Sequence, residues 1–216
     1  MKPYKTILNE SEAELSIQKS RFIGYALPVE NEQEAVQFIE KIKKKHYNAT
    51  HNVPVYLIGE DMMVQRYSDD GEPSGTAGIP ILEMLKKEGI TNICIVVTRY
   101  FGGIKLGTGG LVRAYTDSAK AVLESAQVVR KAVFRKLGVT IPYHLHGKVQ
   151  NAILGREDVY ICNTDYSDYV KIEMYVLEGL QEAVVELLVD LTSNQALCQV
   201  DEMEYLTEAD GKLLEI

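Results

Sequence analysis

The chain has 216 residues, of which 46% are hydrophobic and 25% are charged, values typical of a globular protein long enough for two ordinary domains. The net charge of −8 is uneven, because residues 1–130 contain 16 Lys and Arg against 16 Asp and Glu, whereas residues 131–216 contain 7 against 15. The sequence has no run of about 18 apolar residues, which excludes a membrane-spanning helix. The acidic second half leaves only the first half as a plausible surface for a polyanion.

The N-terminal segment MKPYKTILNESEAEL lacks the apolar core of a signal peptide, so we expect a cytoplasmic protein. The three cysteines, Cys94, Cys162 and Cys198, lie in or beside apolar segments, and we expect them to be reduced and buried. No Cys-x-x-Cys pair is present and no cysteine lies near His144 and His146, so we expect no metal site of the zinc type.

Strands are expected over residues 4–29, because apolar and polar residues alternate there before Pro28. Asn31 with Glu34 forms a capping-box pattern that predicts the start of a helix. Residues 53–58 and 63–67 are expected to form a hairpin about a glycine-containing turn.

The next segment, SDDGEPSGTAG at residues 68–78, is rich in turn residues. Asp69, Asp70 and Glu72 suggest a site for a hard cation, but the ligand rhythm of a calcium loop is absent, and turn chemistry is the favoured interpretation. Ser74 or Thr76 is expected to cap the helix that follows. Loops of this length are often functional, and we expect this one to pack beside the glycine loop described below and to share one cleft with it.

His51 stands alone before a predicted strand. A structural role is favoured over a catalytic one, because no Ser or Cys nucleophile motif such as G-x-S-x-G accompanies it. We therefore assign no catalytic residue, while His51, Asp70 and Glu72 remain candidates for a hydrolase site.

The most informative segment is TRYFGGIKLGTGGLVRAY at residues 98–115. It leaves a short apolar run, crosses a glycine-rich loop (residues 101–110, the glycine loop) and enters a helix with an apolar face from Leu111. Such a junction presents backbone N–H groups and a helix N-terminus, which bind anions. The spacing fails the Walker A pattern, since Thr108 stands where Lys is required, and it fails the dinucleotide pattern at Val112, so no ATP or NAD cofactor is expected.

Arg113 lies away from the apolar face of this helix. One interpretation is an ion pair with Asp117 at i, i+4 spacing, and the other is an external anion site shared with Arg99 and Lys105. The predicted RNA- or anion-binding set is Arg99, Lys105, Gly107, Thr108, Gly109, Gly110 and Arg113, with His51, Asp70, Glu72, Ser74 and Thr76 as the candidate adjacent loop.

The second half has the element order β-α-β-β-α-β of ferredoxin-like domains. Its strands are expected at 133–143, 159–162, 169–176 and 197–206, and its helices at 145–154 and 180–192. We place the domain boundary between residues 131 and 132, and we expect no sheet to be shared across it. No aromatic signature of an RNA-recognition sheet is present.

With these residues assembled, the chain resembles the bacterial YigZ branch of the IMPACT family. The resemblance rests on KSRF at 19–22, ATH at 49–51, DDGEPSGTAGIPIL at 69–82 and VVTRYFGGIKLGTGGLVRAY at 96–115. It implies an α+β protein whose N-terminal α/β domain is similar to domain IV of elongation factor G, and whose ferredoxin-like domain is similar to domain V of that factor. It also implies a link to translation or RNA and brings no established catalytic residues.

The leading hypothesis is a non-catalytic regulator that binds RNA or a ribosome-associated surface through its N-terminal domain. The first alternative is a regulator that binds a protein partner through the same surface. Eukaryotic members of the family also bind a protein partner, but they use an additional domain for it. The second alternative is a small-molecule hydrolase.

Overall fold

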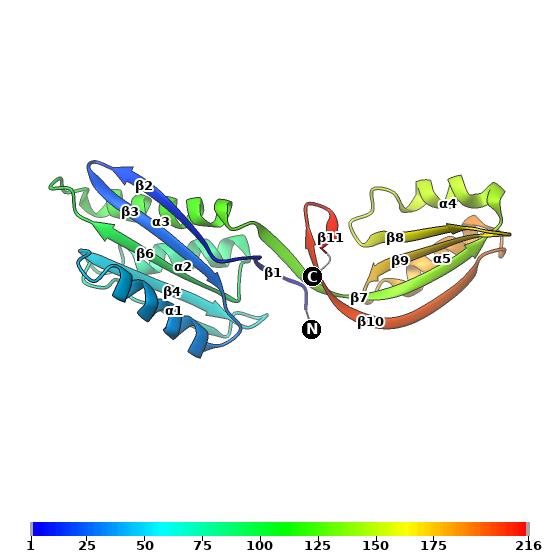
Figure 1. The fold of residues 1–216 in the computed structure, drawn as a ribbon, viewed down its shortest axis with the longest axis horizontal. Helices are drawn as coiled ribbons and strands as arrows, with labels where there is room; N and C mark the ends of the chain where they lie inside the picture. The colour runs from blue at the N-terminus through cyan, green and yellow to red at the C-terminus, as the bar shows by residue number, and fades with distance from the viewer. Residues whose placement is uncertain (1, 215–216) are drawn as a thin grey trace. The chain divides into compact units, whose positions relative to one another are not determined.

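The computed structural model describes residues 2–214 and divides into two compact units, a larger one spanning Tyr4–Arg130 and a smaller one that begins at Lys131 (Figure 1). The elements of the larger unit are β1 (Tyr4–Ile7), β2 (Ser11–Ile17), β3 (Ser20–Pro28), α1 (Glu32–Lys45), β4 (His51–Ile58), β5 (Val64–Tyr67), α2 (Gly78–Glu88), β6 (Ile93–Tyr100) and α3 (Gly107–Ser125). None of the helices in the described part of the chain is long and apolar enough to cross a membrane.

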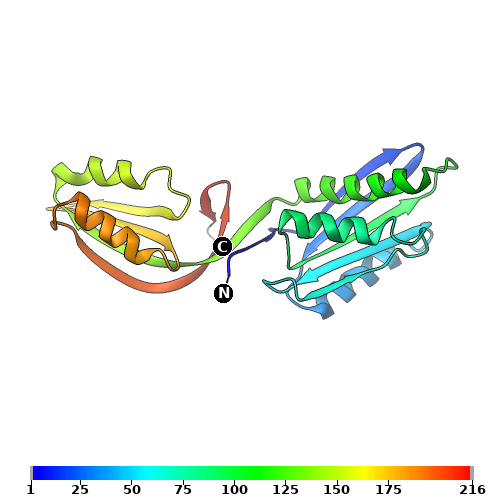
Figure 2. The ribbon, with the colours of Figure 1, turned by 180° about the vertical axis from the view of Figure 1, so that it is seen from behind.

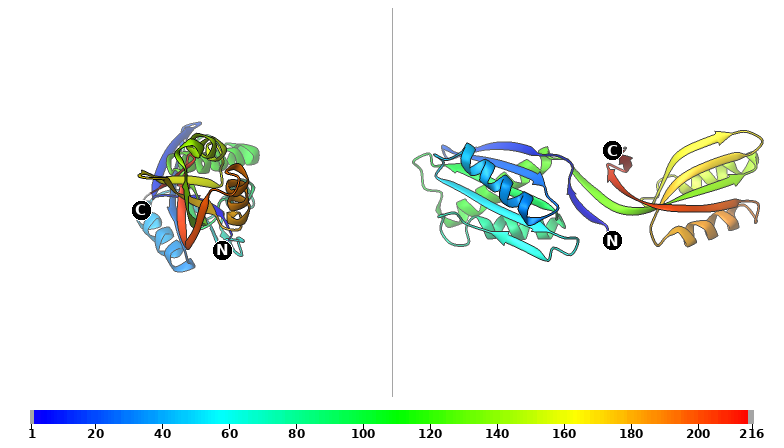
Figure 3. Two further views of the ribbon diagram at one scale, coloured as in Figure 1. Left: turned by 90° about the vertical axis from the view of Figure 1, so that its right-hand side faces the viewer. Right: turned by 60° about the horizontal axis from the view of Figure 1, so that its bottom comes forward.

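The larger unit is built on a five-stranded sheet with the order β2-β3-β6-β4-β5, in which every neighbouring pair is antiparallel. Helix α1 covers one face of this sheet, and α2 and α3 cover the other (Figure 3). Central strand β6 therefore buries both of its faces, because Ile95 and Val97 pack toward α2 and α3 while Cys94 and Val96 pack toward α1. Burial on two faces explains why its sequence is continuously apolar.

Helix α1 begins as the capping box predicts, since the Asn31 side chain accepts a hydrogen bond from the backbone N–H of Glu34. Strands β2 and β3 are joined by a two-residue turn at Gln18 and Lys19, whose φ angles are 47° and 67°. Two successive positive φ values are the geometry of a tight hairpin turn, which sets the register of the two strands. This turn contacts the glycine loop, where the backbone of Lys19 lies against Gly102.

The smaller unit contains most of β7 (Val128–Ile141), then η1 (Tyr143–Leu145), α4 (His146–Ile153), β8 (Val159–Tyr166), β9 (Val170–Leu177), α5 (Gln181–Leu191), β10 (Leu197–Ala209) and β11 (Lys212–Leu214) (Figure 2). The strand order is β11-β10-β7-β9-β8. Alternate residues of β9 join the core formed with α4 and α5, namely Val170, Ile172, Met174 and Val176. The α+β class and the β-α-β-β-α-β order of this half are confirmed.

The strand bounds, the separation of the sheets and the burial of the cysteines differ from what the sequence predicts. Strand β7 begins at Val128 instead of residue 133 and β8 continues to Tyr166, because the pairing with neighbouring strands extends past the apolar runs. Strand β1 pairs with β7, and β7 crosses the division between the units, so the expectation that no sheet strand is shared is wrong. Cys94 is buried, but Cys162 is exposed and Cys198 is half-buried.

The division therefore falls inside a strand and not in a linker. We propose that residues 128–134 nevertheless mark the domain boundary. Limited proteolysis, and the folding of a fragment that begins at Val128 and so keeps the whole of β7, tests this proposal.

Candidate functional site

The loop at residues 68–78, called the acidic loop from here on, is held together by Asp69. Its Oδ1 atom accepts hydrogen bonds from the backbone N–H groups of Ala77 (3.1 Å) and Gly78 (2.8 Å), and its Oδ2 atom accepts one from Gly75 (2.8 Å). Asp69 therefore caps the N-terminus of α2, a role that the sequence analysis wrongly gave to Ser74 or Thr76. A carboxylate in this position also complements the helix dipole.

Ser74 and Thr76, the two residues expected to cap α2, form no side-chain hydrogen bond with the start of that helix within the part of the chain that the structure describes. Ser74 is exposed, and the buried Thr76 hydroxyl donates to the backbone oxygen of Pro73 at 2.6 Å. Neither side chain supplies a helix cap, because the Asp69 carboxylate already accepts from the first N–H groups of α2.

Asp70 connects the acidic loop to β4 and α1. Its carboxylate accepts from the backbone N–H of Asn52 at 2.7 Å and lies 3.0 Å from the Lys43 ammonium. Its backbone oxygen accepts from Nδ1 of His51 at 2.7 Å. Because a carbonyl oxygen can only accept, the His51 ring must carry its proton on Nδ1. Asp70 itself has a φ of 47°, which these contacts keep in place.

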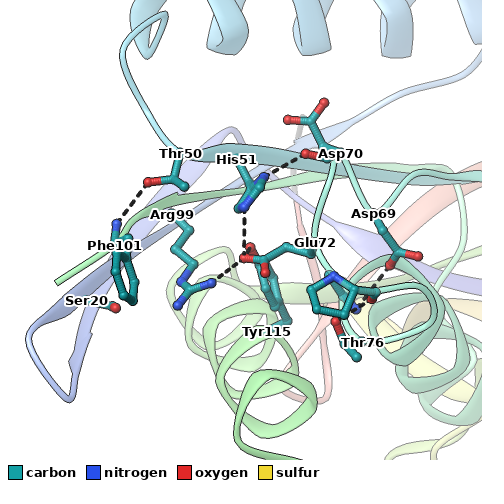
Figure 4. Close-up of polar contacts among 12 residues, drawn as sticks. Ser20, Thr50, His51, Asp69, Asp70, Glu72, Thr76, Arg99, Phe101 and Tyr115 are labelled. Atoms are coloured by element: carbon teal, nitrogen blue, oxygen red, sulfur yellow. Dashed lines mark hydrogen bonds and ion pairs between the residues drawn. The ribbon is translucent and has the colours of Figure 1, made fainter. Parts of the chain in front are cut away.

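Glu72 is the centre of a buried polar cluster (Figure 4). Its Oε1 atom accepts from Nη1 of Arg99 at 2.6 Å and from the hydroxyl of Tyr115 at 2.7 Å, and it lies 3.7 Å from Nε2 of His51. The side chains of Glu72 and Arg99 are only 3% and 7% exposed. Burial and the bond to Glu72 raise the pKa of Tyr115, so its hydroxyl stays protonated and donates.

Arg99 differs from its predicted role. Its guanidinium is paired with Glu72 and lies between two aromatic rings, with Cζ 5.4 Å from the ring centroid of Phe22 and 5.5 Å from that of Phe101. Its Nε atom has no acceptor within residues 2–214. A buried cation with an internal counter-ion is not available to an external anion, so we remove Arg99 from the anion-binding set.

The glycine loop is fastened at its start by two side chains. The hydroxyl of Thr50 accepts from the backbone N–H of Phe101 at 3.0 Å (Figure 4). The hydroxyl of Ser20 accepts from the backbone N–H of Gly102 at 3.1 Å. A Cβ atom on Gly102 would lie 2.0 Å from the backbone carbon and oxygen of Lys19. Glycine is therefore required where the β2–β3 turn touches the loop.

Sequence reasoning assigned no role to Thr50 or Ser20. The signal was present, because both belong to the short motifs ATH and KSRF that carry the family resemblance. The two motifs are far apart in the sequence, so the sequence alone does not show that both contact the glycine loop.

Most residues in the rest of the glycine loop are exposed, although Leu106 packs against the core. Lys105, Gly107, Thr108, Gly109 and Arg113 are exposed, whereas Gly110 is half-buried. Added Cβ atoms on Gly107 and Gly109 would meet nothing within 4 Å, whereas one on Gly110 would lie 3.1 Å from Cβ of Leu106. Helix α3 begins here without a side-chain cap from Leu106, so its first N–H groups have no side-chain acceptor at that position.

Arg113 does not form the alternative ion pair with Asp117 within the described residues, and the same part of the chain offers no ion-pair partner to Lys105. The two loops are linked through Glu72, which contacts Arg99 before the glycine loop and Tyr115 after it. Glu72 and Arg99 are therefore buried together, whereas Lys105 and Arg113 are exposed. In residues 2–214 no cluster of three His, Cys, Asp or Glu side chains could hold a metal ion.

Two family models match the chain, the Impact N-terminal domain at residues 18–123 and a domain of unknown function, DUF1949, at residues 139–195. The chain is 44% identical to IMPACT family member YvyE of Bacillus subtilis (strain 168) over 213 residues, which cover 98% of this chain and 97% of that protein. It is 38% identical to IMPACT family member YigZ of Escherichia coli (strain K12) over 156 residues, which cover 71% of this chain and 76% of that protein.

Among solved structures, a crystal structure of a hypothetical protein is similar to this chain with a TM-score of 0.58 and 31% sequence identity. The alignment covers 94% of this chain and 98% of the other. Both units therefore have counterparts within one solved chain.

Proposed function

The chain belongs to the IMPACT family, and we propose that it is a non-catalytic, translation-linked regulatory protein that binds RNA, or a ribosome-associated RNA surface, through its larger unit. The resemblance to a family whose eukaryotic members regulate translation supports the link to translation. A cytoplasmic location accords with this role. The contacts of His51, Asp70 and Glu72 give these side chains structural roles and favour no hydrolase mechanism.

The RNA proposal rests on one observation. Near the glycine loop, one basic side chain forms an ion pair inside the protein, whereas two others are exposed and form none with the residues that the structure describes. Arg99 is neutralised inside the protein by Glu72, whereas Lys105 and Arg113 are exposed and have no ion-pair partner in residues 2–214. The backbone N–H groups of Gly107, Thr108 and Gly109, three exposed residues at the start of α3, lie between these two basic residues in sequence. Phosphate oxygens accept hydrogen bonds and carry negative charge, so they fit both kinds of group.

The binding should be modest and should depend on salt. The whole chain carries a net charge of −8, and only its first half is electrically neutral. Each phosphate that a basic side chain neutralises on single-stranded nucleic acid contributes about 0.7 to the slope of log affinity against log salt. Contacts of this kind position a nucleic acid without selecting its sequence.

Titration of a fluorescein-labelled single-stranded RNA at two salt concentrations tests the proposal. Arg113→Ala should weaken binding of different sequences to a similar extent, because it removes a phosphate contact. Lys120→Ala is a matched control, since Lys120 is an exposed basic residue seven positions further along α3 and away from the loop, and it should bind nearly as the wild type does.

A protein partner is the second candidate, favoured by the exposed apolar side chains of Phe101 and Ile104 in the same loop. Salt-tolerant capture of one protein, with no binding of RNA by the wild type at low salt, would favour this candidate and contradict the first.

A further inference from the structure

Phe101 is an exposed aromatic residue at the point where β6 ends and the glycine loop begins. It is 47% exposed and lies beside the buried polar cluster (Figure 4). Single exposed hydrophobic residues are common on protein surfaces and need no function. Phe101 differs from such residues because its backbone and its ring are both held by other groups.

The ring of Phe101 is backed by a cation that cannot move freely. Cζ of Arg99 lies 5.5 Å from its centroid, and the same guanidinium lies 5.4 Å from the ring of Phe22 on β3. Glu72 holds Arg99 at 2.6 Å, and the Thr50 hydroxyl holds the backbone N–H of Phe101 at 3.0 Å. The Phe101 ring therefore lies against a guanidinium that Glu72 holds, and these contacts restrict its motion before any ligand arrives.

A fixed aromatic ring binds a flat partner at low entropic cost, because little side-chain freedom remains to be lost. The basic side chains on and near the glycine loop indicate that the partner of the Phe101 ring carries negative charge. Lys19, Lys105 and Arg113 are exposed and have no ion-pair partner in the described part of the chain. The backbone of Lys19 touches the loop at Gly102, the residue next to Phe101. A flat group flanked by phosphates complements an aromatic ring on a loop that carries such cations.

We propose that Phe101 stacks on an unpaired base of bound RNA, so that the glycine loop prefers single-stranded RNA to duplex RNA. This inference rests on the proposed RNA-binding function. Bases within a duplex are stacked on each other and offer no free face, whereas unpaired bases stack on aromatic side chains in a way that tolerates any sequence. The phosphates on either side of the base then meet the basic side chains.

The first test compares a fluorescein-labelled single-stranded oligouridine with a duplex of the same length. Wild type should bind the single strand more tightly. Phe101→Ala should weaken single-strand binding by about 5- to 150-fold, the range expected for one lost base stack, and should change duplex binding little. Ile104→Ala is the matched control, because Ile104 is an apolar residue of the same loop with a similar exposure of 41%, and its effect should be much smaller.

A second variant gives a direct optical readout. The chain contains no tryptophan, so Phe101→Trp introduces a single one at the proposed stacking position. Its fluorescence should be quenched by single-stranded oligouridine and not by the duplex. This measurement also serves if Phe101→Ala proves unstable, since tryptophan keeps an aromatic ring next to Arg99.

The outcomes separate the two proposals. If wild type binds no RNA at low salt, the proposed function fails and this inference fails with it. If wild type binds but Phe101→Ala is no weaker than Ile104→Ala, or if bound RNA leaves the tryptophan fluorescence unchanged, only the stacking inference is overturned.

Discussion

The acidic loop and the glycine loop both precede a helix of the larger unit, but they use their charged side chains in opposite ways. In the acidic loop, Asp69 binds three backbone N–H groups, Asp70 binds Asn52 and Lys43, and Glu72 binds Arg99 and Tyr115. In the glycine loop, Lys105 has no ion-pair partner within the described residues. A cluster of polar residues can thus serve the fold, while the neighbouring loop leaves its cation exposed, as the proposed RNA-binding role requires.

The largest expected effect comes from removing the centre of the acidic loop. Glu72→Ala leaves the Arg99 cation buried without its counter-ion, and breaking a buried pair in this way costs about 3–5 kcal/mol. Chemical denaturation should show this loss in the free energy of unfolding. Glu83→Ala is the control, because its exposed i, i+3 pair with Lys86 is worth about 0.2–0.5 kcal/mol. Equal losses in the two variants would show that Glu72 is not the organising residue.

A pair of glycine substitutions tests the division within the glycine loop. Gly102→Ala places a Cβ atom 2.0 Å from the Lys19 backbone, and the resulting overpacking should destabilise the protein by about 1–3 kcal/mol. Gly109→Ala meets nothing within 4 Å and lies in α3, so it should leave stability unchanged or raise it by up to about 1 kcal/mol. Thermal or chemical unfolding measures both. A stable Gly102→Ala variant would contradict the close contact between the β2–β3 turn and the loop.

A smaller, pH-dependent effect on stability is expected from His46, whose ring nitrogens lie within hydrogen-bonding distance of two tyrosine hydroxyls. Its Nε2 lies 2.7 Å from the hydroxyl of Tyr25 and its Nδ1 lies 2.8 Å from that of Tyr100. Burial lowers the pKa of His46, and the nearby cations Lys45 and Arg21 lower it further, while the Glu12 carboxylate acts in the opposite direction and raises it. The unfolded chain therefore binds a proton more readily, and stability falls as the pH falls below the ordinary value of about 6.5.

The slope contributed by His46 cannot exceed about 1.4 kcal/mol per pH unit, the value for one proton. Unfolding free energies of wild type and His46→Gln between pH 5 and pH 8, a range taken about the ordinary histidine pKa, measure it. The variant should be less stable at neutral pH but should lose stability less steeply on acidification. Parallel curves would exclude His46 as the source.

The sequence correctly predicted those structural features that depend only on residues close together in the chain. The buried strand β6, the apolar face of α3 and the Asn31 cap each follow from a local pattern of side chains. The ferredoxin-like order of the smaller unit follows from such patterns as well. The contacts of Arg99 do not, because its partner Glu72 lies 27 residues earlier and reaches it only through the folded sheet. Local spacing placed Arg99 with the anion-binding residues, although folding pairs it internally.

The same reason explains the missed cap of α2. Ser74 and Thr76 are nearer to the helix start in sequence, but Asp69 reaches the N–H groups because the loop turns back on itself, with Asp70, Gly71 and Gly75 at positive φ. Helix-cap rules identify the residue type and not a distant residue brought near by a turn.

We propose above that Lys105 in the glycine loop and Arg113 in α3 bind RNA and are not needed by the fold. The most direct test combines two measurements on the double variant Lys105→Ala/Arg113→Ala, namely the salt dependence of single-stranded RNA binding and the free energy of unfolding. We expect the slope of log affinity against log salt to fall by about 1.4, since each lost phosphate contact contributes about 0.7, while stability stays within about 0.5 kcal/mol of wild type. An unchanged slope, or a wild type that binds no RNA at low salt, would contradict the claim.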